Sequence, residues 1–290
     1  MSPADRLAAE FEAQRPYLRR LAYGTLGSLA DADDVVQEAW LRLQRVDATE
    51  IRDLRAWLTR TVGRLALDAL ASARRRREQY VGTWLPEPLV EDRRADDPAD
   101  RVTLDESVTT ALLVVLERLS PAERTAFVLH DVFGVPFDDV GEIVGRAPTA
   151  VRQLASRARR HVEAGTPRFP ASRDEQAQIV GAFAVAAQAG DVAALLRVLD
   201  PQVEYRADGG GKAIAARHPL LGAERVARTV TKIAGKYWTT VAPTTVNGMP
   251  GLLVDDGGEA FAVVSFTVDR GRIVALDIVR NPDKVHLPAP

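Results

Sequence analysis

The side chains with the clearest chemical capability lie in the segment from Pro148 to Arg160. Its polar members include Thr149, Arg152, Gln153, Ser156 and Arg157. Arginine presents a fork of donors that matches guanine edges and phosphates, and glutamine can pair with an adenine edge. These residue types, gathered in one short segment, predict contacts to DNA bases or phosphates.

The apolar residues of the same segment predict the helix that presents those polar groups. They recur at helical spacing, at Val151, Leu154, Ala155, Ala158 and Val162. One stripe of the helix would therefore pack on its own domain and leave the polar side chains outside. An amphipathic segment from Phe137 and a turn at Gly145 come before it. This order is typical of a helix-turn-helix, whose second helix enters the DNA major groove.

Basic charge is concentrated in two blocks, although the 290-residue chain has a net charge of −2. Residues 52–80 hold eight arginines against three acids, and residues 146–168 hold six against Glu163. Because local clusters rather than net charge set the affinity for phosphates, the overall balance does not exclude DNA binding.

The first basic block predicts a long helix over residues 52–77. Its expected inner stripe is Leu54, Trp57, Leu58, Thr61, Leu65 and Ala69, and its outer stripe is Arg60, Arg64, Ala71 and Arg74. Four consecutive arginines from Arg74 point around the whole helix, so at most two share a surface. A basic stripe over several turns favours a DNA backbone as its partner, contacted by Arg60, Arg64, Arg74 and Arg75.

The segment from Asp31 predicts an acidic amphipathic helix with Asp31 as its cap. Its buried stripe is expected to be Val36, Ala39, Trp40 and Leu43. The opposite side carries Asp34, Gln37, Glu38 and Leu41. Acids around one exposed leucine suit either a solvated face or a docking face for a partner helix.

The chain separates into five segments. Residues 1–80 are helical, residues 81–101 form a linker with several prolines and an acidic run, residues 102–164 are helical, residues 165–173 form a second linker, and residues 174–290 are α+β. Ser120, Pro121 and Glu123 mark a helix start with a capping box. Helices over residues 175–189 and 192–199, followed by alternating stretches from Ala260 and Arg272, predict an antiparallel sheet in the last domain.

Composition excludes some chemistry. The chain has no cysteine, so disulfides and thiolate zinc sites are excluded, and we expect neither a metal nor a cofactor. No apolar run is long enough to cross a membrane, and the N-terminus lacks an apolar signal segment, which favours a soluble cytoplasmic protein without a membrane partner.

Polar residues of the last domain raise the alternative of catalysis. They are Asp208, Lys212, His218, Asp255, Asp256, Asp277 and Asn281. The histidine and an aspartate could form an acid/base pair, but Asp255 and Asp256 precede Gly257 and Gly258 in a predicted hairpin turn. The three glycines after Asp208 permit positive φ and a close approach to another surface, while the segment lacks the spacing of a P-loop.

Together, DADDVVQEAWLRL, RAWLTRTVGRLALDALASARRRR and LSPAERTAFVLHDVFGVPFDDVGEIVG resemble a sigma-70 family factor of the extracytoplasmic-function type. The resemblance implies that the first domain binds the β′ clamp helices of core RNA polymerase through Asp34, Gln37, Glu38 and Leu41. It also implies that the basic helix meets the minus-ten element of promoter DNA, and that the second domain reads the minus-thirty-five element and touches the β flap. No active site is needed for this role.

WLPEPL, DGGGK and NPDK are further similar to the subfamily with a SnoaL-like C-terminal extension, the sigma factor J type. This resemblance implies a SnoaL/NTF2-like cone domain and regulatory contacts between extension and linker. The residues concerned are Trp84, Leu85, Pro86, Glu87, Pro88, Asp208, Gly209, Gly210, Gly211, Lys212, Asn281, Pro282, Asp283 and Lys284. Whether the extension also binds a small-molecule ligand is left open.

The leading hypothesis is therefore a promoter-specificity factor modulated by its own C-terminal domain. One alternative is a DNA-binding regulator fused to a cyclase- or isomerase-like enzyme, in which Asp208, His218 or Asp277 would be essential for turnover. Another is an ordinary repressor or activator that binds its operator without polymerase, against which the acidic helix from Asp31 argues.

Overall fold

The computed structural model describes residues 3–47, 51–77, 80–90, 108–255 and 260–285. By its contacts the chain divides into two compact units. Unit 1 combines residues 1–78, 97–102 and 115–165, and unit 2 combines residues 79–96, 103–114 and 166–290. The linker residues 80–90 thus pack with the C-terminal part of the chain. The acidic run Glu91, Asp92, Asp96, Asp97 and Asp100 lies outside the described residues, and the boundaries of the five predicted segments stay a prediction.

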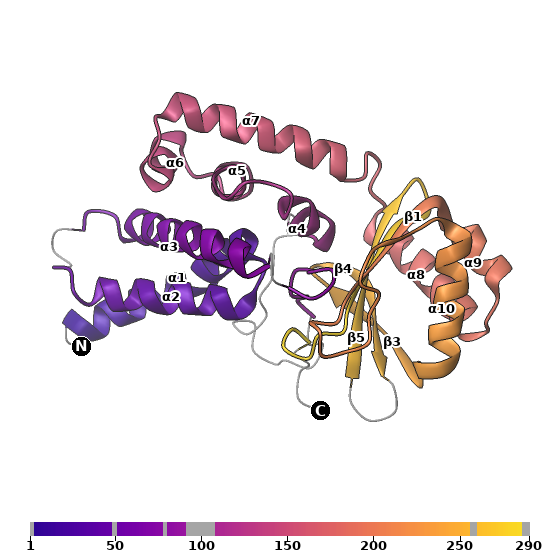
Figure 1. The fold of residues 1–290 in the computed structure, drawn as a ribbon. Coiled ribbons are helices and arrows are strands. Elements are labelled where there is room, and N and C mark those ends of the chain that lie inside the picture. The colour runs from indigo at the N-terminus through magenta and orange to yellow at the C-terminus, as the bar shows by residue number, and fades with distance from the viewer. Residues whose placement is uncertain (1–2, 48–50, 78–79, 91–107, 256–259, 286–290) are drawn as a thin grey trace. The chain divides into compact units, whose positions relative to one another are not determined.

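Unit 1 is helical in its described residues (Figure 1). Its elements are α1 (Pro3–Leu26), α2 (Leu29–Leu43), α3 (Leu54–Arg77), α5 (Pro121–Phe127), the short π-helix η2 (Val128–Val132), α6 (Phe137–Val144) and α7 (Pro148–Gly165). None of the helices in the described ranges is long and apolar enough to span a membrane.

The predicted stripe of α2 is confirmed, but its cap is not Asp31. Val36, Ala39 and Leu43 are at most 1% exposed, and Trp40 lies with its ring centroid 4.8 Å from that of Phe11 on α1. The helix begins two residues before the predicted cap, and the Ser28 hydroxyl accepts a hydrogen bond from the Asp31 backbone. A serine in extended conformation satisfies the first-turn donors, so Asp31 sits inside the helix.

The predicted inner stripe of α3 is wrong by a rotation about the helix axis. The buried apolar residues are Leu58, Val62, Ala66, Leu70 and Ala73, whereas all the predicted ones except Leu58 are only half-buried. Helix α3 contacts α1, α2, α5 and α6, and the residues that these neighbours bury form one stripe at helical spacing. Because α3 carries apolar residues on more than one side, spacing alone does not tell which stripe meets those neighbours.

The second helical segment is built as predicted. The Ser120 hydroxyl accepts from the Glu123 backbone while the Glu123 carboxylate accepts from the Ser120 backbone, which completes the capping box of α5. Gly145 ends α6 in the left-handed conformation with φ of 68°, and Pro148 begins α7. The buried residues of α7 are Val151, Leu154, Ala155 and Ala158, while Val162 is half-buried. The helix-turn-helix is therefore present.

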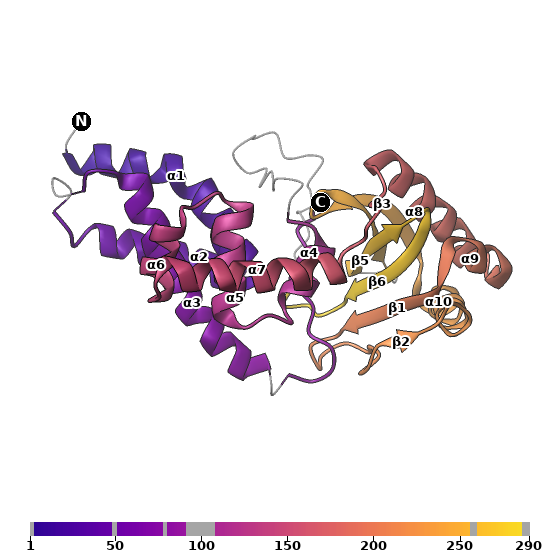
Figure 2. The ribbon, with the colours of Figure 1, turned by 90° about the horizontal axis from the view of Figure 1, so that it is seen from above.

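Unit 2 contains one sheet with helices on one of its faces (Figures 1 and 2). Its described strands are β1 (Leu199–Asp208), β2 (Leu220–Leu221), β3 (Thr240–Val246), β4 (Met249–Asp255), β5 (Ala260–Asp269) and β6 (Arg272–Val279), in the order β2-β1-β6-β5-β4-β3. The helices on that face are α8 (Arg173–Gln188), α9 (Val192–Val198) and α10 (Ala223–Tyr237). The short helix α4 (Thr110–Leu116) is divided between the units after Val114.

The α+β class is confirmed, but the sheet is mixed rather than antiparallel. β1 and β6 pair in parallel, with Tyr205 opposite Leu276 and Arg206 opposite Asp277. The other paired strands are antiparallel. Alternation along a strand shows that one face is buried and carries no information about a partner that lies far away in the chain.

Both faces of the sheet in unit 2 carry buried side chains. Val264, Phe266 and Ile278 belong to the apolar core with α8 and α10. Their neighbours Ser265 and Asp277 are also buried and lie opposite each other in the β5–β6 register. Because successive side chains alternate between faces, the second face carries a polar row toward which the linker residues pack.

Candidate polymerase, DNA and linker-docking surfaces

The acidic face of α2 is exposed. Asp34, Gln37 and Leu41 are all exposed, with Leu41 at 37%. The Glu38 carboxylate accepts from Arg42 Nε at 3.0 Å. The structure thus presents the four residues predicted to bind polymerase on the outer side of α2, opposite its buried stripe.

The predicted DNA-reading residues of α7 also lie on one outer face. Thr149, Arg152, Gln153, Ser156 and Arg157 are all exposed. The Arg152 guanidinium carbon lies 5.3 Å from the ring centroid of Phe137, and Arg157 Nε lies 3.1 Å from Glu123. These two contacts orient the arginines without burying them.

Glu123 has two roles in this geometry. Its pKa is lowered, mainly because the Ser120 hydroxyl donates to it, with a smaller contribution from the charge of Arg157. The carboxylate therefore stabilises the start of α5 while holding an arginine of α7.

The predicted DNA contacts of α3 are engaged within unit 1. Arg60 Nη1 lies 3.2 Å from Asp139 and 3.6 Å from Glu142, and Arg64 Nη2 donates to the Glu142 carbonyl at 3.0 Å. Sequence reasoning did not pair these arginines with the acids of α6, although opposite charges on the two helices were the available signal. The side chains of Arg74 and Arg75 lie outside the described residues.

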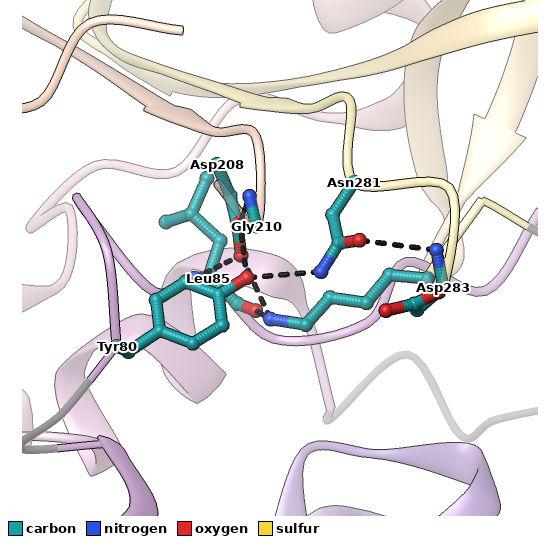
Figure 3. A network of polar contacts seen from close by, with 7 residues as sticks. Tyr80, Leu85, Asp208, Gly210, Asn281 and Asp283 are labelled. Atoms are coloured by element: carbon teal, nitrogen blue, oxygen red, sulfur yellow. Dashed lines mark hydrogen bonds and ion pairs between the residues drawn. The ribbon is translucent and has the colours of Figure 1, made fainter. Parts of the chain in front are cut away.

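The residues predicted as regulatory contacts converge on Asp208, which is fully buried. Its Oδ2 accepts from the Leu85 backbone at 2.9 Å and from Lys284 Nζ at 2.7 Å. Its Oδ1 accepts from the Tyr80 hydroxyl at 2.6 Å and from the Gly210 backbone at 3.0 Å. Figure 3 shows the carboxylate between the linker and the strand ends. We call Tyr80, Leu85, Asp208, Asn281 and Lys284 the linker-docking cluster.

Lys284 and Asn281 complete the cluster from the end of the chain. Lys284 Nζ donates to the Leu85 carbonyl at 2.6 Å and lies 4.0 Å from the ring centroid of Trp84. Asn281 Nδ2 donates to the Tyr80 hydroxyl at 2.9 Å. Burial, together with the hydrogen bond to Asp208, raises the pKa of Tyr80. Tyr80 was not predicted as a contact, because a single tyrosine at a linker edge carries no distinctive pattern.

The remaining predicted contacts differ in burial. Leu85, Pro86, Glu87 and Pro88 are buried and Trp84 is half-buried. Gly210 has φ of 62°, and a Cβ there would collide with the Asn281 amide. The adjoining glycines are Gly209, which is buried, and Gly211, which is exposed. Lys212 and Asp283 form an exposed ion pair at 2.6 Å, and Pro282 is exposed.

Among the described residues, the exposed His218 is not paired with either buried aspartate considered for catalysis, Asp208 or Asp277. Asp277 accepts from Arg206 Nε at 2.6 Å and Nη2 at 2.9 Å, whereas His218 is exposed on a loop. Burial would lower the pKa of Arg206, but the carboxylates of Asp277 and Glu204 outweigh it and raise the pKa. The Asp208 carboxylate accepts hydrogen bonds within the linker-docking cluster. Asp255 ends β4, and Asp256 lies outside the described residues. The enzyme alternative therefore gains no support from the geometry.

Comparison with known proteins matches both helical parts of unit 1. Residues 11–76 match the model of sigma-70 region 2, and residues 109–162 match that of sigma-70 region 4. The ECF RNA polymerase sigma factor SigJ of Mycobacterium tuberculosis is 43% identical, over 95% of this chain and 92% of its own length. This chain belongs to the ECF RNA polymerase sigma factors. The probable ECF sigma factor SigI of the same organism is 35% identical, over 97% of this chain and 96% of its own length.

A crystal structure of M. tuberculosis SigJ gives the same architecture for this sigma factor. It has a TM-score of 0.79 and 40% identity, and it covers 96% of this chain and 97% of that chain. As a member of the family, this sigma factor binds core RNA polymerase and directs initiation at specific promoters. The SigJ structure covers the C-terminal part as well, where this chain has a mixed sheet with α8, α9 and α10 on one face.

Proposed function

We propose that the outer face of α2 is the surface that binds core polymerase, at the β′ clamp helices. The observation that carries this proposal is the exposure of Asp34, Gln37 and Leu41 on the side of α2 opposite its core. An exposed leucine flanked by acids offers a small apolar anchor with a charged rim, and such a combination suits a helical partner of opposite charge.

The DNA-binding surfaces are α3 for the minus-ten element and α7 for the minus-thirty-five element, with the β flap as the second polymerase contact of the helix-turn-helix part. The exposed polar face of α7 supports the assignment for that helix. On α3, Arg60 must leave the carboxylates of α6, and Arg64 must leave the Glu142 carbonyl, before the two arginines can meet phosphates. This factor works where the polymerase works, in the cytoplasm, and it contributes recognition rather than catalysis.

The C-terminal domain regulates the factor through the linker-docking cluster. A buried carboxylate that holds a backbone N–H and a lysine gives the linker a defined docked state. Release of the linker leaves Asp208 to regain water, so docked and undocked states differ in their contacts, as a switch requires. Modulation of initiation by this domain is the finer part of the proposal.

Run-off transcription with core polymerase and the intact chain tests the polymerase surface. Asp34→Arg combined with Glu38→Arg reverses the charge of the face, and we expect loss of core binding and of transcript. Glu10→Arg combined with Asp174→Arg makes the same charge change at exposed positions elsewhere and should leave both unchanged. Holoenzyme assembly by the α2 variant at the level of the wild type would contradict the assignment.

The regulatory role is tested in the same assay with Tyr80→Phe and Lys284→Gln. Tyr80→Phe removes one hydroxyl from the cluster and leaves the buried Asp208 paired with Lys284, so the fold is retained. We expect both variants to bind core polymerase normally and to give a changed amount of transcript. Transcript levels equal to the wild type for both would refute regulation through this cluster.

A further inference from the structure

A cavity of about 110 Å³ lies in unit 2 on the helix-covered face of the sheet. Most of its lining is aliphatic or aromatic, including Phe183, Val230, Ile233, Val264, Leu276 and Ile278. A cavity with such walls offers water few hydrogen bonds and favours an apolar occupant. This cavity lies on the opposite face of the sheet from the linker-docking cluster.

One end of the otherwise uncharged cavity carries a positive charge. Of the described residues that line it, Arg280 alone carries a formal charge. Its Nη1 donates to the Ile214 carbonyl, and its guanidinium carbon lies 5.9 Å from the ring centroid of Tyr237. Ile214 is 75% exposed, which places this charged end at the opening of the cavity.

Neighbouring cations add to the positive potential at that end. The pKa of Tyr237 is lowered, first by a hydrogen bond with Lys236 and further by the charges of Lys236, Arg280 and Lys232. No aspartate or glutamate is among the described residues lining the cavity. An anionic group would therefore be stabilised where the apolar walls end.

We propose that this cavity binds a small, largely apolar carboxylic acid, with its carbon body inside and its carboxylate on Arg280. An engineered cavity of about 150 Å³ holds benzene, so the present one, which is smaller and opens at the Arg280 end, takes a body no larger than about one six-membered ring. The carboxylate takes the place of the Ile214 carbonyl as the acceptor for the guanidinium, in a charge-assisted hydrogen bond.

Arg280 is directly joined to the linker-docking cluster. Ile278 faces the cavity, whereas Val279 packs with Leu85 on the opposite face. Beyond the end of β6, Arg280 lines the cavity and the Asn281 amide donates to Tyr80 of the cluster, so these two neighbours also point to opposite faces. Their two backbone N–H groups both donate to the Asp208 carbonyl, at 2.7 and 3.0 Å. A ligand that moves Arg280 therefore moves the backbone that holds Asp208 and Asn281. This step rests on the proposed regulatory role and adds that ligand occupancy changes linker docking.

The tryptophans provide reporters for both faces in the full-length chain. Trp238 lines the cavity, and Trp84 lies against Lys284 of the cluster. Trp40 and Trp57 belong to unit 1 and serve as internal controls. The experiment is fluorine NMR of the protein labelled with 5-fluorotryptophan and titrated with phenylacetate. The neutral comparison probe is 2-phenylethanol, which has the same carbon body.

We expect phenylacetate to shift the Trp238 and Trp84 resonances with one common Kd of about a millimolar, leaving Trp40 and Trp57 unchanged. The neutral alcohol should bind about tenfold more weakly because it lacks the charge-assisted bond. Arg280→Gln should abolish this preference for the acid. Arg228→Gln, at an arginine of α10 that is 75% exposed, should retain it.

A second variant, Ala262→Leu, keeps the proposal testable if Arg280→Gln does not fold. Ala262 is 3% exposed and lines the cavity, so Ala262→Leu should fill the space and prevent binding of both probes. Equal affinity for acid and alcohol in the wild type, or no shift of Trp238 at about 10 mM probe, would overturn the site. A shift of Trp238 without Trp84 would overturn the coupling. The titrations contain no polymerase, so they test the ligand site independently of the regulatory role. If only the regulatory role is wrong, the titrations give the expected shifts while Tyr80→Phe transcribes at the wild-type level.

Discussion

At the scale of single residues, Asp208 and Lys284 show how a buried charge is made tolerable. The carboxylate is fully buried and Lys284 is 9% exposed. The carboxylate accepts from two backbone N–H groups, a hydroxyl and the ammonium group, so its loss of water is compensated by hydrogen bonds. The exposed pair of Lys212 and Asp283 comes from the same two loops and stays in water.

The two lysines therefore predict different losses of stability. Lys284→Gln leaves Asp208 buried without a cation and should lower the free energy of unfolding of unit 2 by about 3–5 kcal/mol. Lys212→Gln should cost about 1 kcal/mol or less, because solvent screens its pair. Urea denaturation followed by circular dichroism and tryptophan fluorescence measures both. Equal midpoints for the two variants would show that the buried pair is not what stabilises the docked linker.

At the scale of elements, the capping box of α5 sets where the helix-turn-helix part begins. Ser120 and Glu123 satisfy backbone donors at the start of the helix, and Glu123 also reaches Arg157 on α7. Because α5 packs on both α3 and α7, its start bears on the packing of all of unit 1. The same motif begins α8 in unit 2, with Ser172 and Glu175.

Ser120→Ala should lower the free energy of unfolding of unit 1 by about 1 kcal/mol. The folded pKa of Glu123 lies below its unfolded value, so the carboxylate contributes fully above about pH 4.3 and loses its contribution as the pH falls through the folded pKa. The difference between wild type and variant should therefore shrink in acid. Urea denaturation at neutral pH and below pH 4 measures this, with Ser156→Ala on the exposed face of α7 as a control expected within about 0.5 kcal/mol of wild type. A difference that grows in acid would contradict the sign.

At the scale of the whole molecule, two arginines of α3 that are expected to meet promoter DNA are engaged by α6, Arg60 by the carboxylates of Asp139 and Glu142 and Arg64 by the Glu142 carbonyl. Gly63 lies where α3 meets α6, and a Cβ there would be 3.0 Å from Ile143 Cδ1. This close approach lets α6 lie against the surface of α3 that carries Arg60 and Arg64. DNA binding by α3 then requires the two helices to separate.

A disulfide between Gly63→Cys and Ile143→Cys tests that requirement. A Cβ at Gly63 would lie 3.3 Å from Ile143 Cγ2, so the two Cβ atoms fall near the separation of about 3.5–4.5 Å that disulfides need. The chain has no other cysteine, so this bond is the one disulfide that can form within it. We expect the oxidised protein to give little run-off transcript and the reduced protein to recover. Each single variant is the control, and an active oxidised protein would show that α3 acts without separating from α6.

Local patterns predicted the elements well, and distant partners were predicted poorly. Spacing and caps identified the helix-turn-helix and the start of α5, because the relevant contacts lie within a few residues. The α3 stripe and the direction of β1 against β6 depended on packing between distant segments. The placement of Arg60 on Asp139 depended on it too. Tyr80 entered the cluster only through the fold, since its hydroxyl meets Asp208 from far away in the sequence.

The burial of the linker in unit 2 changes what a shortened chain would report. Leu85, Pro86 and Pro88 are buried, and Leu85 packs with Val279 and Val285, which come much later in the chain. Ending the protein near Arg168 would remove these residues and expose the apolar linker segment to solvent. An exposed apolar segment is prone to self-association and to cleavage by proteases. A change in the transcription given by such a fragment would therefore have two causes, the loss of the C-terminal domain and the exposure of an apolar surface. Single substitutions such as Tyr80→Phe keep the apolar linker segment buried and so separate the two effects.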